Sequence, residues 1–116
     1  MKEHVRSVAT RVWHALGPGF SERVYHNAME VGLRRLNVPY QTERIVPIVF
    51  DDHAIGNIRA DLVVDSRIIV ELKSVKALKD EHRVQTRMYM RLLGLGEGVL
   101  INFPNSGNEL EIEEIV

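Results

Sequence analysis

The order of the predicted elements indicates an α/β fold, with helices flanking a central mixed β-sheet. Two segments with helical periodicity come first, three strand-like segments follow, and a third helical segment precedes two more strands, in the order ααβββαββ. A strand, a helix and a strand in succession form a crossover, which makes the two strands parallel partners in one sheet. With 116 residues, 45% of them hydrophobic, the chain suits one domain with a single core.

Two amphipathic helices are expected at the start of the chain. Apolar residues at helical spacing predict a helix over residues 3–16 that ends at Gly17-Pro18-Gly19. Ser21 is a suitable N-cap for a second helix, which runs to about Leu36. The apolar stripe of this second helix consists of Tyr25, Met29 and Leu36, with Gly32 or Leu33 between them.

The remaining elements are five strands and one helix. The strand-like segments cover residues 44–50, 58–64, 67–73, 99–103 and 110–115. Turns at Asp51-Asp52-His53 and Asp65-Ser66 join the first three, and Pro47 places the first strand at an edge or a bulge. The third helix spans about Lys79 to Leu93 and ends at a glycine-rich segment. Its predicted buried side carries Val84, Met88 and Leu92.

Composition narrows the possible functions. The chain has no cysteine, which excludes disulfides, thiolate zinc sites and iron–sulfur clusters. No apolar run approaches the roughly 18 residues of a membrane span, and the charged N-terminus lacks the apolar region of a signal peptide, so we expect an intracellular protein. The net charge of −1 argues against a general basic surface. The five histidines show no paired metal-ligand spacing and are interpreted as surface or capping residues.

Acidic and basic side chains come together in the middle of the chain. Glu71 and Lys73 lie two residues apart on a predicted strand and therefore share one face, while Val70 and Leu72 point to the other. If the strand of Asp61 pairs beside it, two carboxylates and an ammonium group converge. A strand that is otherwise apolar has little reason to carry charge at its end. Oxygen ligands of this kind suit Mg²⁺ or Mn²⁺.

Two helices contribute further polar candidates. Glu22 shares the helical face of Tyr25 and Met29, although an acid in a first helical turn is also explained by the helix dipole alone. Gln85 and Tyr89 lie one turn apart on the third helix, where a surface glutamine beside a half-buried tyrosine is the ordinary alternative.

Several short motifs follow one another in a specific order. The segment Gly19 to Tyr25 reads G-x-x-E-x-x-Y, and the further motifs are Leu16–Phe20, Arg59–Asp61, Val70–Lys73, the Gln85–Tyr89 spacing and Leu100–Phe103. Together they resemble the GxxExxY protein family, within the PD-(D/E)XK nuclease superfamily, over nearly the whole chain. The Gln85–Tyr89 spacing is similar to that of RecB-like nucleases. One departure is Ala60, where the superfamily pattern has proline, which contributes backbone shape and not a ligand.

The resemblance implies a restriction-endonuclease-like core with assigned roles. Asp61 and Glu71 correspond to the metal-binding acids, Lys73 to the catalytic lysine, Glu22 to the extra acid of λ-exonuclease-like members, and Gln85 to the glutamine of the fourth motif. From these assignments we expect a Mg²⁺- or Mn²⁺-dependent nuclease acting on phosphodiester bonds, above all in DNA.

Additional contacts are expected around this centre. The Leu72 carbonyl is a further candidate metal ligand. The predicted contacts to the nucleic-acid backbone come from Lys76, Lys79, Arg83, Arg87 and Arg91. The alternative function is a weakly active or non-catalytic subunit that binds nucleic acid or protein and keeps the nuclease fold, which the near-neutral charge favours. Exonuclease or endonuclease action, DNA or RNA, and a homodimer or a monomer all remain open.

Overall fold

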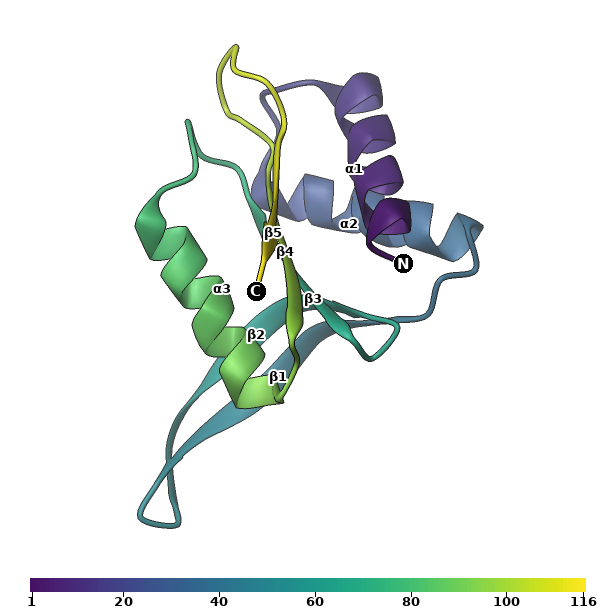
Figure 1. The fold of residues 1–116 in the computed structure, drawn as a ribbon. Coiled ribbons are helices and arrows are strands. Elements are labelled where there is room, and N and C mark those ends of the chain that lie inside the picture. Colours follow the sequence, from purple (N-terminus) through teal and green to yellow (C-terminus); the bar gives the residue numbers. More distant parts are fainter.

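The computed structural model describes all 116 residues, and it has the predicted order of elements. Helices α1 (Lys2–Leu16) and α2 (Glu22–Arg35) cover one face of a five-stranded sheet, and α3 (Asp80–Leu93) covers the other (Figure 1). The strands are β1 (Tyr40–Phe50), β2 (His53–Val64), β3 (Ile68–Lys73), β4 (Glu97–Asn102) and β5 (Glu111–Ile115). No helix is long and apolar enough to cross a membrane.

The sheet is mixed, and its strands lie in sequence order from β1 to β5. Neighbouring strands are antiparallel except β3 and β4, which α3 connects and which are parallel, as the crossover predicts. The turns at Asp51-Asp52 and Asp65-Ser66 have positive φ at both residues, the conformation that matches the twist of two-residue hairpins. Both predicted hairpin turns are confirmed.

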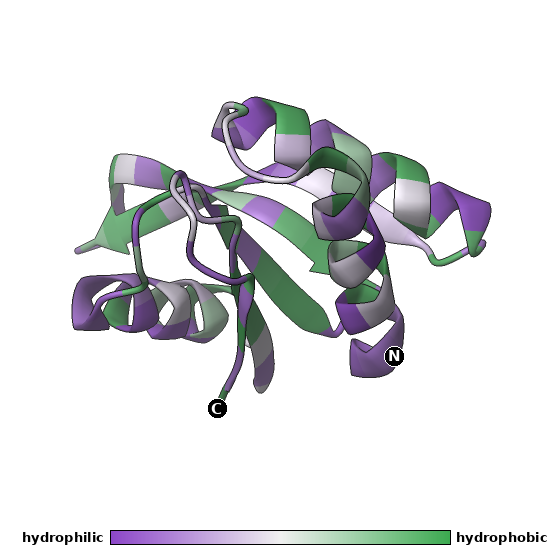
Figure 2. Ribbon diagram, turned by 90° about the horizontal axis from the view of Figure 1, so that it is seen from above, coloured by the Kyte–Doolittle hydropathy of each residue, from purple (hydrophilic) through white to green (hydrophobic).

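The sheet separates two apolar clusters, and β3 contributes to both. Ile68, Val70 and Leu72 pack with α1 and α2, whereas Ile69 packs with α3. Apolar strands therefore lie between more polar helices, as Figure 2 shows. The alternation places Glu71 on the α3 side of the strand, where it is buried.

The helices begin and end close to the predicted residues, but two predicted buried faces need correction. In α2 the buried stripe ends with Leu33, and Leu36 is 38% exposed because it follows the last helical turn. In α3 the buried residues are Thr86, Tyr89 and Met90, not the predicted set, whose first member Val84 is 62% exposed. Met90 packs where Gly98 leaves no room for a Cβ atom, so the sheet selects that face of the helix.

The first hairpin is longer than predicted. β1 starts at Tyr40 instead of residue 44, and β2 starts at His53 instead of residue 58. Since β3 pairs with β2 only over Leu62–Val64, the preceding part of the hairpin has no third strand beside it. We call this part, residues 45–59, the arm. It projects from the body of the protein (Figure 1). Pro47 lies on β1, which is an edge strand as predicted.

Candidate active site

The β2–β3 ladder stops where the predicted acids begin. The last paired residues are Leu62 and Val70, so Asp61 and Glu71 are next in register. Instead of a ladder, the two carboxylates bridge the strands. The Asp61 amide donates to Glu71 Oε2 at 2.9 Å, and the Leu72 amide donates to Asp61 Oδ2 at 2.8 Å. The chain therefore brings these two acids together, with backbone donors fixing one oxygen of each.

Glu71 is an unusual buried acid. Its side chain is only 3% exposed. Burial first, and then the negative charge of Asp61, raise the pKa of Glu71 to about 9, against the opposing effects of the Asp61 amide and the Lys73 charge. Without a bound cation, the raised pKa therefore favours the protonated form of Glu71 at neutral pH.

Lys73 lies beside this acidic pair and is held by α3. Its Nζ donates to Gln85 Oε1 at 2.9 Å. Tyr89, one turn later, is 8% exposed; burial, followed by the charges of Glu71 and Asp61, raises the pKa of its hydroxyl. Gln85 and Tyr89 thus face the acids from α3, as their spacing predicts, and Gln85 orients the ammonium group.

Glu22 enters from the opposite layer, at the start of α2. The Ser21 hydroxyl caps the helix by accepting from the Val24 amide at 3.4 Å. Burial first, and then the negative charge of Asp61, raise the pKa of Glu22, while the positive charge of Lys73 opposes the shift. Glu22 is therefore within electrostatic range of the acidic pair, and its carboxyl group is partly desolvated although the residue as a whole is exposed.

Tyr25 fixes the loop that leads to Glu22. Its hydroxyl donates to the Gly17 carbonyl at 2.6 Å and accepts from the Phe20 amide at 3.4 Å. Its ring is fully buried and stacks on Phe103 with the centroids 4.5 Å apart. Gly19 has φ of 109°, which other residues rarely adopt. The G-x-x-E-x-x-Y segment is thus a connected turn that sets where α2 begins.

His26 is a site residue that the sequence prediction placed wrongly. It is 3% exposed, not a surface histidine, and its Nε2 lies 2.8 Å from Thr42 Oγ1 and 3.0 Å from Glu30 Oε2. It lines a small hollow of about 150 Å³ together with Glu22, Arg23 and Asp61. Its position four residues after Glu22 and four before Glu30 is the helical signal that shows it on the site-facing side.

The comparisons with known proteins agree with this fold. Residues 1–115 match the model of the PD-(D/E)XK nuclease superfamily. The chain belongs to this superfamily. The crystal structure of SSO0001 has the same fold, with a TM-score of 0.61 and 22% sequence identity, over 81% of this chain. The chain spans about half of that structure, 49% of its length. A search of curated proteins found no match.

Superfamily membership supports a nuclease-type function and confirms the restriction-endonuclease-like core, while the roles of the acids and of Lys73 stay predictions. The finer resemblance to the GxxExxY family, and to λ-exonuclease-like and RecB-like members, stays a prediction. PD-(D/E)XK nucleases typically use divalent metal ions.

The donor atoms present suit such an ion, but they are not gathered around one point. Asp61 Oδ1 and Glu71 Oε1 accept no hydrogen bond, so each acid has one oxygen available. No three His, Asp or Glu side chains converge closely enough to coordinate a metal. Glu22 is therefore not brought into one ligand set with the pair in this arrangement. The predicted metal-binding roles of Glu22 and of the Leu72 carbonyl therefore stay predictions.

The predicted nucleic-acid contacts fall into two groups. Lys76, Lys79, Arg87 and Arg91 are exposed around α3 and form no ion pair, which leaves them available to a phosphate backbone. Arg83 differs, because its Nε and Nη2 donate to the two carboxylate oxygens of Glu113 at 2.7 and 2.8 Å and its Nη1 donates to Asp80 at 2.9 Å. Among the predicted contacts, Arg83 is thus engaged by acids of β5 and of α3 itself.

Proposed function

We propose that this superfamily member hydrolyses phosphodiester bonds in DNA with the help of Mg²⁺ or Mn²⁺. The observation that carries the proposal is the Asp61–Glu71 pair beside Lys73. Burial of Glu71, and then the adjacent charge of Asp61, raise the Glu71 pKa to about 9, and such a pair gains most from a bound cation. An arrangement that served folding alone would be replaced at little cost by apolar residues.

The free oxygens of Asp61 and Glu71 would hold the cation, with Glu22 and the Leu72 carbonyl as further ligands. A bound divalent ion supplies Lewis acidity, which lowers the pKa of a coordinated water and offsets charge on a phosphate. The backbone amides of Asp61 and Leu72 keep the two carboxylates in place, so that little rearrangement of the strands is needed.

We assign Lys73 the role of positioning the attacking water or of stabilising the negative charge that develops on the phosphate. Its Nζ has three protons, of which Gln85 accepts one at 2.9 Å, and the others remain for the water or a phosphate oxygen. An ammonium group that is already oriented stabilises developing charge without reorganisation. Tyr89 is buried on the α3 side of the same site.

Contacts to the DNA backbone would come from Lys76, Lys79, Arg87 and Arg91, which have no acidic partner. Such contacts position the substrate without reading its sequence. Arg83 contributes less in this proposal, since its guanidinium is engaged by Glu113 and Asp80. DNA is favoured over RNA only by the resemblance, and both belong in the test.

A non-catalytic nucleic-acid-binding or protein-interaction subunit is the second candidate. The observation in its favour is that no three acids converge on one point. It predicts binding without turnover, and metal binding without cleavage.

The deciding experiment incubates linear and circular DNA, and a matched RNA, with the protein in Mg²⁺, Mn²⁺, Ca²⁺ or excess EDTA. We expect cleavage with Mg²⁺ or Mn²⁺, binding without efficient cleavage in Ca²⁺, and loss of cleavage in Glu71→Gln. Glu109→Gln is the matched control, because Glu109 is exposed and forms no ion pair. Equal cleavage in EDTA, or an unimpaired Glu71→Gln variant, would contradict the proposed centre.

A further inference from the structure

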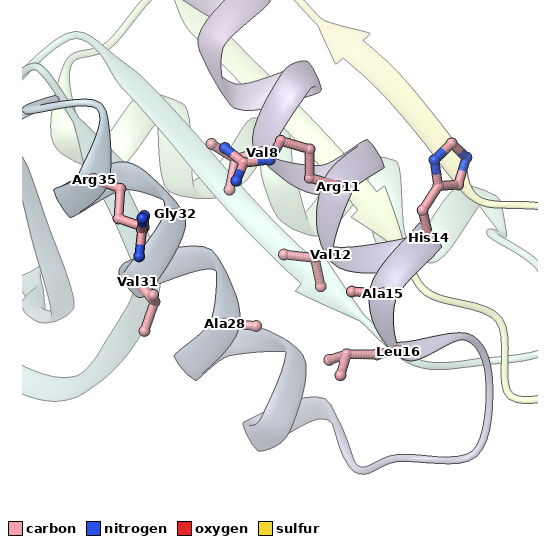
Figure 3. A pocket seen from close by; sticks show the side chains of 10 residues that line it. All are labelled: Val8, Arg11, Val12, His14, Ala15, Leu16, Ala28, Val31, Gly32 and Arg35. Carbon is pink, nitrogen blue, oxygen red and sulfur yellow. The ribbon is translucent and has the colours of Figure 1, made fainter.

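An open apolar groove runs between α1 and α2, away from the candidate active site (Figure 3). Its volume is about 560 Å³. The apolar lining comes from Val8, Val12 and Leu16 on α1 and from Ala28 and Val31 on α2. Val31 is 47% exposed, so apolar surface of the groove faces solvent. The two helices touch at Gly32, where a Cβ atom would lie 2.4 Å from Val8, and this close contact closes the bottom of the groove at that point.

Two arginines without acidic partners lie along this groove. Arg11 and Arg35 line it and form no ion pair. Five of the nine other arginines do form an ion pair: the paired set is Arg6, Arg23, Arg34, Arg67 and Arg83. The groove therefore offers apolar surface bordered by uncompensated positive charge. A complementary partner presents apolar side chains next to carboxylates.

The end of the arm has this complementary composition. The segment 49–55, called the tip, exposes Val49, Phe50 and Ile55 to 58%, 65% and 64%. Between them Asp51 and Asp52 form the hairpin turn and have no ion-pair partner. Large apolar side chains beside free carboxylates thus occur on the most protruding segment of the protein.

The tip and the groove of one molecule cannot meet. Figure 1 shows the tip projecting from the lower left of the molecule, on the far side from α1 and α2. The whole molecule, arm included, is elongated, with extents of 47 by 31 by 23 Å. A contact between the two surfaces must therefore join two molecules.

We propose that the tip of one copy of this chain docks in the α1–α2 groove of a second copy. The aromatic ring of Phe50 fills the apolar groove, and Asp51 and Asp52 pair with Arg11 and Arg35. Every copy has both surfaces, so two copies can exchange tips reciprocally and form a closed two-fold dimer. Reciprocal exchange doubles the buried area, which a specific interface needs to reach about 1,200 Å². The proposal is independent of the nuclease function.

Site-specific cross-linking tests this contact directly, because the chain has no cysteine. Ala54→Cys places a thiol on the tip and Val31→Cys places one in the groove. A mixture of these two variants under mild oxidation should give at least about tenfold more disulfide-linked heterodimer than Ala54→Cys mixed with Ser106→Cys, since docking raises the effective thiol concentration. Equal yields in the two mixtures would overturn the proposal.

Charge reversal in the groove provides a second test. The mass of the wild type, measured by light scattering, should rise with concentration from 13.3 kDa toward twice that value. Arg11→Glu with Arg35→Glu should keep the protein monomeric and abolish the cross-link, with an unchanged melting temperature as evidence of folding. Arg87→Glu with Arg91→Glu makes the same charge change on α3 and should still associate. A wild type that stays at 13.3 kDa, or association that survives reversal of the groove arginines, would overturn the proposal.

Discussion

The acidic centre and the arm lie on the same β-hairpin, yet they depart from an ordinary surface in opposite ways. At the centre, β2 meets β3 and both helical layers, and Glu71 is buried to 3% exposure among other charges. On the arm, β2 has only β1 beside it, and Phe50 and Ile55 remain 65% and 64% exposed. One region buries charge and the other exposes apolar surface, and both arrangements cost free energy in the isolated chain.

The difference between them lies in what offsets that cost. The centre has internal partners, since backbone amides bind the two carboxylates and Gln85 binds the Lys73 ammonium group. The tip of the arm has none, since Phe50 and Ile55 are exposed and Asp51 and Asp52 form no ion pair. Internal satisfaction suits a site that must be rigid before its substrate arrives. An unsatisfied tip suits contact with a second molecule. The following predictions test this contrast, beginning with the largest expected effect.

Lys73→Ala should lower DNA cleavage by about 100-fold or more, because a single oriented charge of this kind contributes roughly 3 kcal/mol to the transition state. Metal affinity should stay the same or rise slightly, since a cation is removed beside the acids. Single-turnover cleavage and a Mn²⁺-dependent thermal shift measure the two quantities. A variant that cleaves at the wild-type rate would make Lys73 a strand residue without a chemical role.

Glu71→Gln should abolish most of the stabilisation that Mn²⁺ gives the wild type, which scales as RT ln(1 + [L]/Kd). Without metal, the same change should raise the melting temperature by about 2 to 5 °C or leave it unchanged, because a neutral amide replaces an acid that burial disfavours. Thermal melts with and without Mn²⁺ provide both values, and Glu109→Gln serves as the control. A lower metal-free melting temperature with full Mn²⁺ stabilisation would make Glu71 purely structural.

The metal-free protein should lose stability as the pH rises from about 5 to 8. The pKa of Glu71 is about 9 in the folded protein and its usual value is 4.5, so the folded state binds more protons over this range. Stability is then greatest below the unfolded pKa and falls as the pH rises toward the folded one. The raised pKa of Glu22 adds to this slope. Urea denaturation at several pH values measures it, and Glu71→Gln should flatten the curve; an equal slope in that variant would assign the effect elsewhere.

Phe50→Ser should change the free energy of unfolding by no more than about 0.5 kcal/mol, the usual range for exposed sites. The reason is that the Phe50 ring contacts water in the single molecule and is 65% exposed. Dilute protein is needed, so that association does not contribute. A loss of several kcal/mol in urea denaturation would show that the tip packs internally and would remove the contrast with the centre.

The helices show which structural features a periodic sequence pattern can predict. Their positions follow from capping and spacing, and Ser21 at the start of α2 is confirmed as a cap. The side of α3 that is buried was predicted wrongly, because several faces of that helix carry apolar residues. Contact between Met90 and Gly98, two segments brought together only by the crossover, selects the face that is buried.

The chemical identity of the site was determined by the sequence itself. The strand period places Glu71 and Lys73 on one face, and the spacing on α3 brings Gln85 and Tyr89 to the same corner. These are local regularities of the backbone, and they need no knowledge of the rest of the fold.

Tertiary structure alone decided the rest. The ladder ends at Leu62 and Val70, so Asp61 and Glu71 are not a paired rung, and their carboxylates bridge the strands by accepting from backbone amides. It also buried His26 and left the arm without a third strand. The burial of a side chain, the pairing of strands and the exposure of apolar surface all depend on which distant segments become neighbours. A local pattern in the sequence does not specify those neighbours.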